Sequence, residues 1–318
     1  MKKILFSPLI LLITIFSVSA QEFDKVEDYV AHIKKNHKLV YDDVTAYLLK
    51  LESGNMPVAE AQRRVFTKKA PDIIVSIHGM PSFKGDKTLQ DSLAAYMRRT
   101  YWIMEKEYPK IQRMQDSATR SYSSALKFSQ AKRTALNSLI KDESNFFEGL
   151  KAFSGKNGVA VPASYDNEYE KMLYVKDVAS HHTTLELIVD KCKAEETILA
   201  KAVQAKSKEG MEEHAAILEK YVKEGYALLD TVKPYKQDRS LLDAARSTLA
   251  FYQSESEFKV PILLHLLAEG NVRQAPTADT DGVATYPNTQ KDLDLDRAAA
   301  WDRWTKASAA FIKKYLPQ

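Results

Sequence analysis

The chain has 318 residues, of which 45% are hydrophobic and 28% charged, and its formal net charge is only +4. This length suits two domains or one elongated two-part domain, and either arrangement can bury a sizeable core. The near balance of acidic and basic residues argues against a polyanionic partner such as a nucleic acid. Cys192 is the single cysteine, so the sequence offers no internal disulfide, and its apolar neighbours predict a buried, unreactive thiol.

The first twenty residues have the pattern of a secretory signal peptide. Lys2 and Lys3 precede a mostly apolar run, and Val18-Ser19-Ala20 is a small-residue cleavage site. The run is short for a transmembrane helix, and no later stretch is apolar enough to span a membrane. We therefore expect cleavage after Ala20 and export to the periplasm, the cell surface or the extracellular medium. An uncleaved signal anchor is the alternative.

The rest of the chain predicts an all-α fold. Apolar residues at helical spacing, bounded by capping residues, Gly and Pro, predict four helices in the first half, at about 26–51, 59–77, 88–114 and 121–153. The same criteria predict four in the second half, at about 167–204, 209–232, 241–267 and 293–315. Because most connections are short, neighbouring helices should run antiparallel.

One segment occurs twice with an offset of 152 residues. Residues 83–91 read FKGDKTLQD, residues 235–243 read YKQDRSLLD, and Pro109 and Pro261 keep the same spacing downstream. This pattern indicates an internal duplication, with two similar up-and-down helical bundles of about four helices each. The signal peptide would occupy residues 1–20, the first unit 21–158 and the second unit 159–318. Both prolines are expected to kink their helix.

Each copy of the repeated segment predicts the start of a helix. Thr88 and Ser240 each precede an acidic residue by three positions, the arrangement of an N-terminal capping box. Their hydroxyls are expected to accept hydrogen bonds from the first backbone N–H groups. Asp86 and Asp238 are the alternative caps, and a pair of ligand sites, one in each unit, is the functional alternative.

The two halves differ in charge. Residues 21–158 carry a net charge of +6, and residues 159–318 carry −4. The simpler interpretation is that the halves attract each other where they dock. A weak anion-binding face on the first half is the alternative.

Two His-x-x-x-Glu pairs are the candidate metal ligands. His182 with Glu186, and His265 with Glu269, are four residues apart and so share a helix face. Two such pairs that face each other across a bundle could hold a divalent ion. The Glu-x-x-His spacing of di-iron bundles is absent, and surface histidines with local ion pairs are the simpler interpretation.

Aromatic residues and a long loop are the candidate partner-binding features. Tyr101 and Trp102 are adjacent, so on a helix they diverge by about 100° and cannot share one buried stripe. The segment 269–290 is rich in Gly, Pro, Thr and Asp and is long for a compact helical domain. We expect it either to bind a partner or to be anchored by Val283 or Tyr286 inserted between helices.

No signature of a common catalytic site is present. The sequence lacks a nucleophile elbow, a zinc-protease helix, a phosphate-binding glycine loop and a Cys-x-x-Cys pair. It therefore favours an exported helical protein with a structural or partner-binding role, whose partner is a protein or another envelope component. The alternative is a metal-binding helical bundle or enzyme that uses the two His-x-x-x-Glu pairs. The sequence indicates no particular cofactor.

Overall fold

The computed structural model describes residues 23–118, 121–161, 164–270 and 285–316. The predicted signal peptide and most of the predicted loop, including Val283, lie outside this part of the chain. Within it the protein is all-α and has no strands, as the sequence predicts. The described helices number eight when a helix that contains a π turn is counted as one.

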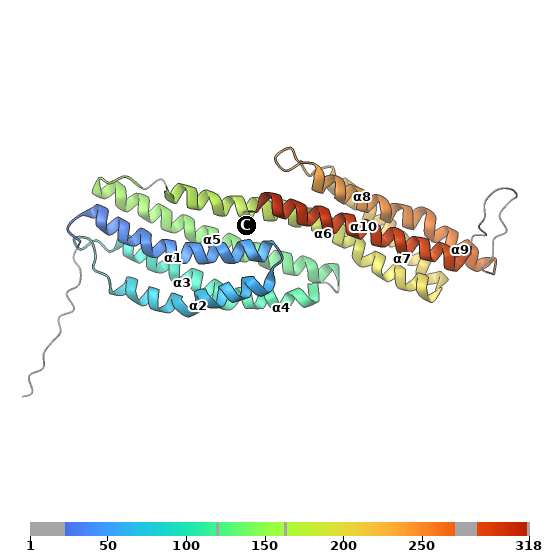
Figure 1. Cartoon of the computed structure of the whole chain (residues 1–318), viewed down its shortest axis with the longest axis horizontal. Helices are drawn as coiled ribbons and strands as arrows, with labels where there is room; N and C mark the ends of the chain where they lie inside the picture. The colour runs from blue at the N-terminus through green and yellow to red at the C-terminus, as the bar shows by residue number, and fades with distance from the viewer. Residues whose placement is uncertain (1–22, 119–120, 162–163, 271–284, 317–318) are drawn as a thin grey trace, which may run out of the picture.

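The first half forms one bundle, drawn in blue to green in Figure 1. Its elements are α1 (Val26–Glu52), α2 (Met56–Gly79), α3 (Thr88–Trp102), a π turn (Ile103–Glu107), α4 (Tyr108–Ala118) and α5 (Tyr122–Asn157). Apolar side chains from all of these helices share one buried core, which includes Phe66, Leu93 and Phe146.

The second half forms another bundle at the other end of an elongated molecule (Figure 1). Its elements are α6 (Ser164–Ala205), α7 (Lys208–Leu229), α8 (Ser240–Ser254), a π turn (Glu255–Lys259), α9 (Val260–Ala268) and α10 (Tyr286–Tyr315). They enclose a second core, which includes Leu218, Leu249 and Trp304. Helix α10 returns toward the middle of the molecule, alongside α6 and α8.

Helix α6 belongs to both bundles. Met172 packs in the first core, and Val175, less than one turn later, packs in the second. At its N-terminal end the Tyr41 hydroxyl of α1 donates to the Glu168 carbonyl over 2.8 Å. The buried His37 ring lies between Glu143 of α5, at 2.9 Å from its nearer oxygen, and Glu168, at 3.6 Å. These contacts fasten α6 to the first bundle before it continues into the second.

The repeated segment adopts the same turn in both places. Asp86 N–H donates to the Phe83 carbonyl at 2.9 Å, and Asp238 N–H donates to the Tyr235 carbonyl at 2.8 Å. The two central residues of each turn have positive φ, 49° and 82° in the first and 47° and 68° in the second. Positive φ at both positions is the geometry of a type I′ turn. Each opening aromatic ring is buried, as expected for a side chain that packs over the turn.

The aspartates, and not the hydroxyl residues, hold the starts of α3 and α8. Asp86 accepts from the Thr88 backbone N–H at 2.9 Å, and Asp238 accepts from that of Ser240 at 2.8 Å. The hydroxyls of Thr88 and Ser240 cap neither helix, which corrects the first of the two capping predictions. The type I′ turn places each aspartate two residues before the helix start, within reach of that N–H. Lys156 binds Asp86 at 2.7 Å and, with Thr88, lowers its pKa to about 2.

A π turn stands just before each of the two matched prolines, where the sequence predicts a kink. Proline has no N–H to give to the carbonyl four residues earlier, and its ring collides with that carbonyl in a regular α-helix. A π turn widens the helix locally and relieves this collision. The turns Ile103–Glu107 and Glu255–Lys259 lead into Pro109 and Pro261. The helices therefore continue past both prolines.

Several helix ends differ from the sequence prediction, and two of the differences have a clear local cause. Helix α10 begins at Tyr286, earlier than expected, because the Thr285 hydroxyl accepts from Asn288 N–H and Pro287 fits the first turn. Helix α5 runs to Asn157 and ends at Gly158, whose φ of 69° is readily adopted by glycine. The sequence predicts that α5 stops at Gly155.

The aspartate caps can be tested against the hydroxyl residues that follow them. We expect Asp86→Ala and Asp238→Ala each to lower the free energy of unfolding by about 0.5–2 kcal/mol, because a helix-start N–H loses its acceptor. Thr88→Ala and Ser240→Ala should each change it by less than about 0.5 kcal/mol. Urea unfolding at pH 7 measures all four. The stabilising effect of Asp86 is present above its unfolded pKa near 4 and should disappear as the pH falls toward 2.

The two turns also provide a matched pair of backbone variants. Gly85 tolerates positive φ at little cost, whereas Gln237, which occupies the equivalent place, does not. Gln237→Gly should therefore raise the free energy of unfolding by about 0.5–1 kcal/mol, and Gly85→Gln should lower it by a similar amount. A Cβ at Gly85 would meet no atom within 4 Å, so backbone strain is the only expected cause. Equal stability of both variants and the wild type would contradict this account.

Candidate ligand cleft between α5 and α6

A cleft of about 650 Å³ lies where the two bundles meet. Its first wall comes from α4 and α5, and its second wall comes from α6 and α7. The first wall presents small and aromatic side chains: Ser121, Tyr122, Ala125, Phe128 and Ser129. The second wall presents mainly charged and polar side chains, among them Glu186, Asp190, Lys191, Glu195 and Tyr221. The small side chains of α5 leave the cleft open on one side, and longer side chains of α6 line the other side.

Two carboxylates of α6 give the cleft its electrostatic character. Burial, and then the negative charge of Glu186, raise the pKa of Asp190 to about 7. Burial also raises the pKa of Glu186. Asp190 thus exchanges a proton near neutral pH, where its protonated form donates a hydrogen bond and its ionised form accepts one. A buried acid with this property is a recurrent feature of functional sites.

Lysines flank these acids but are engaged elsewhere. Lys191 forms an ion pair with Glu224 of α7 and lies 4.4 Å from the centre of the Tyr221 ring. The ammonium of Lys193 lies 3.5 Å from the centre of the Trp301 ring of α10. Both contacts hold α6 against the second bundle, so the acid-bearing wall is fixed in place.

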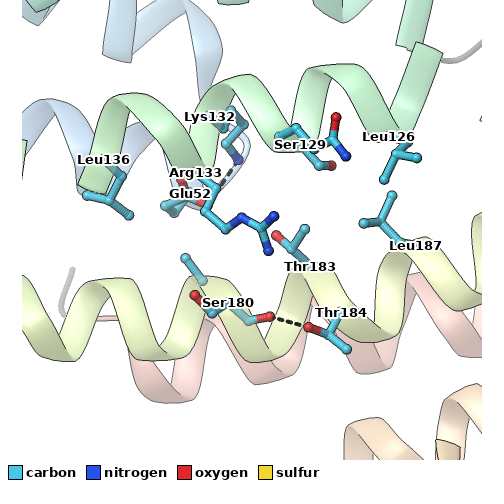
Figure 2. A pocket seen from close by; sticks show the side chains of 12 residues that line it. Glu52, Leu126, Ser129, Lys132, Arg133, Leu136, Ser180, Thr183, Thr184 and Leu187 are labelled. Atoms are coloured by element: carbon cyan, nitrogen blue, oxygen red, sulfur yellow. Dashed lines mark hydrogen bonds and ion pairs between the residues drawn. The ribbon is translucent and has the colours of Figure 1, made fainter. Parts of the chain in front are cut away.

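A smaller chamber of about 140 Å³ adjoins the cleft, and both are lined by Ser129. Figure 2 shows its two sides, with Leu126, Ser129, Lys132 and Arg133 above and Ser180, Thr183, Thr184 and Leu187 below. Lys132 forms an ion pair at 3.0 Å with Glu52, the last residue of α1. The Arg133 side chain extends from α5 into the gap toward Thr183 (Figure 2).

The predicted metal ligands do not come together. His182 lies beside Ser308 of α10, with 2.6 Å between its Nε2 and the hydroxyl oxygen, and 3.8 Å from Glu186. Burial and the nearby Lys132 lower the pKa of His182 to about 4. His265 and Glu269 form a separate ion pair at 3.1 Å on the surface of α9 and its C-terminal end. Within the described part of the chain, no three His, Cys, Asp or Glu side chains are grouped to hold a metal ion.

The predicted partner-binding residues have different environments. Trp102 is 54% exposed at the end of α3, whereas Tyr101 is partly buried against the first core. Tyr286 is fully buried, and its hydroxyl donates to the Val203 carbonyl at 2.6 Å. It therefore anchors the start of α10 and presents no surface to a partner, in line with the packing alternative for that residue. Val283 lies outside the described residues.

The sequence alone does not identify Asp190 or Arg133 as site residues. It also does not identify a buried charged cluster in the second bundle. Glu196 and Glu255 both contact Arg297, the latter at 2.7 Å. Burial, and then Glu196, raise the pKa of Glu255 to about 8. No local sequence pattern marks these residues, because each faces a helix far away in sequence. The small residues among positions 121–129, four serines and one alanine, are the one signal that α5 leaves space beside it.

Cys192 is fully buried in the second core, as predicted. Burial raises the pKa of its thiol to about 12, so the thiolate form is rare at neutral pH. The thiol is therefore a small packing group.

The raised pKa of Asp190 predicts how the free energy of unfolding depends on pH. The unfolded carboxyl ionises near pH 4 but the folded one near pH 7, so the folded state loses stability as the pH rises through this window. Asp190→Asn removes this effect. It should match the wild type near pH 4 and exceed it above pH 7 by on the order of 1 kcal/mol or more.

Urea unfolding of both proteins at pH 4, 6 and 8 measures the difference. Asp292→Asn is the control, because that side chain is exposed on α10. A stability difference that does not change with pH would contradict the assignment of the buried proton to Asp190.

Comparisons with known proteins provide no relative for this architecture. No family model, curated protein or solved structure matches the chain. Among the described helices, none combines the length and apolar character needed to cross a membrane. The cleft itself is therefore the feature of the molecule that indicates a function.

Proposed function

We propose that this chain is an exported helical binding protein that holds a ligand between its two bundles. The observation that carries the proposal is the cleft of about 650 Å³ between α5 and α6. Its volume lies within the range of about 300–1,000 Å³ that is usual for ligand pockets. The signal-peptide pattern of residues 1–20 supports export to the periplasm, the cell surface or the extracellular medium.

The lining of the cleft supports binding by contact and hydrogen bonding. Tyr122, Phe128 and Tyr221 provide aromatic surface, which contributes large contact area at low entropic cost. Asp190 and Glu186 provide carboxylates in a partly buried setting, where polar contacts are stronger than in water. The two walls belong to different bundles, so a bound ligand would also join them.

We further propose that the two bundles arose by duplication of one helical unit. The equal type I′ turns, the aspartate caps and the π turns before Pro109 and Pro261 all keep the offset of 152 residues. In this proposal the cleft lies between copies, formed by the last helix of one and the first helix of the next.

A second role, docking of a protein or envelope component, is favoured by Trp102. A tryptophan that is 54% exposed at the end of α3 is available to a partner, and tryptophan is over-represented in binding hot spots. The metal-binding alternative has less support, because within the described residues no three His, Cys, Asp or Glu side chains are grouped to hold an ion.

A variant that fills the cleft tests the binding proposal. Ala194 lines the larger cleft from α6, so Ala194→Trp should occupy much of the space. Small molecules that co-purify with the natively exported wild type would be extracted, identified by mass spectrometry and titrated back. We expect Ala194→Trp to weaken the binding of the tightest-binding molecule at least tenfold, because the Trp side chain would occupy the place of the ligand.

Val75→Trp is the matched control, because it adds the same ring at a highly exposed position of α2. Circular dichroism and thermal unfolding establish that both variants fold. Equal affinity in Ala194→Trp and the wild type would overturn the cleft as the binding site, as would a wild-type protein that retains no molecule and binds none from an extract.

A further inference from the structure

We propose that the chamber around Arg133 binds the carboxylate or phosphate group of the ligand. This inference rests on the proposed function, because the chamber opens beside the larger cleft and shares Ser129 with it. It assigns one chemical feature to the ligand, a single anionic end, and one position for that end. The charge of the chamber, its hydrogen-bonding groups and its size support this assignment.

The charge of the chamber is positive. Glu52 and Lys132 neutralise each other through their ion pair at 3.0 Å, and the Glu52 side chain is largely buried. Among the described residues that line the chamber, Arg133 is then the one charge without an ion-pair partner. A guanidinium presents several N–H donors in a planar fork that matches two oxygens of a carboxylate or phosphate.

Hydroxyl groups face the guanidinium across the gap. Thr183 lies opposite Arg133 on α6, and Ser129 lies one turn from it on α5 (Figure 2). Within the described part of the chain, neither of these two hydroxyls makes a hydrogen bond to another residue, so both can donate to an incoming oxygen. Thr184 differs, because its hydroxyl donates to the Ser180 carbonyl at 2.8 Å. An anion in the chamber would meet donors from both helices.

The volume limits what can enter. A space of about 140 Å³ is close to that of an engineered cavity of about 150 Å³ that binds benzene, so it suits one functional group or a small ring. Leu126, Leu136 and Leu187 line the same space, while Arg133 is exposed, so an anion would reach the guanidinium directly from solvent. The rest of the ligand would extend past Ser129 into the larger cleft.

The larger cleft carries charges of both signs. Glu186 and Asp190 line it from α6, and Lys193 and Lys201 of the same helix line it as well. A ligand body in this cleft could therefore contact carboxylates or ammonium groups. The ligand class is a small molecule with one carboxylate or phosphate for the chamber and a polar body for the cleft.

Titration with simple anions tests the chamber alone. The probes are sodium phosphate and sodium acetate, added separately to the purified mature protein at constant ionic strength and followed by two-dimensional NMR. We expect saturable shifts of the Thr183 and Ser129 amides with at least one probe. Arg133→Gln should weaken that binding at least about tenfold, the usual effect of losing a hydrogen bond to a charged group.

Two further variants sharpen the result. Arg303→Gln removes an exposed arginine of α10 and should leave the affinity unchanged. Arg133→Lys keeps the charge but loses the planar fork, so an intermediate affinity is expected. A response to phosphate alone identifies a phosphate group, a response to acetate alone identifies a carboxylate, and both results support the proposal.

The Ala194→Trp variant separates this inference from the proposed function. It fills the larger cleft and leaves the chamber open, so it should still bind the anion probe. No saturable response up to 50 mM of either probe, or equal binding by Arg133→Gln and the wild type, would overturn the chamber as an anion site. If the co-purified ligand nevertheless still fails to bind Ala194→Trp, the cleft remains the binding site without the anion chamber.

Discussion

The arrangement of the molecule depends on one helix, α6, which is 42 residues long and contributes to both cores. A helix of this length spans roughly 60 Å, so it can pass through one bundle and continue into the next. Its first turns are held by Tyr41 and by the buried group of His37, Glu143 and Glu168. A continuous helix bends little, so this attachment also fixes the position of the second bundle.

The cleft is a consequence of how α5 and α6 pack. Each bundle buries large apolar residues in its own core, such as Phe146 of α5 and Leu185 of α6. Where α5 carries Ser and Ala instead, the second wall cannot fill the space, since its side chains are charged and remain near solvent. Burying Asp190 there is unfavourable, and its raised pKa is the measure of that cost. Acids kept in unfavourable surroundings are common at functional sites, which supports the proposed binding role of the cleft.

The sequence predicts the helices well because their signals are local. Periodic apolar residues, Gly and Pro stops and capping residues identify every described helix, and the repeated segment identifies two equal turns. Local reasoning cannot choose the cap, because Asp86 and Thr88 are both good caps and the turn before Asp86, with positive φ at two residues, decides between them. The extent of the duplication beyond these turns stays a prediction.

The candidate site could not be predicted in the same way. Arg133 and Thr183 are fifty positions apart in the sequence, and their meeting depends on the angle at which α6 leaves the first bundle. The net charges of the two halves, +6 and −4, do carry part of the information, because the charge of Lys132 on α5 acts on Glu186 of α6 and opposes the effect of burial on its pKa. This opposition need not be satisfied by direct ion pairs. Lys132 forms its ion pair with Glu52, within its own half, so in the proposed binding role the Arg133 guanidinium and the Asp190 carboxyl are the groups left for a ligand to contact.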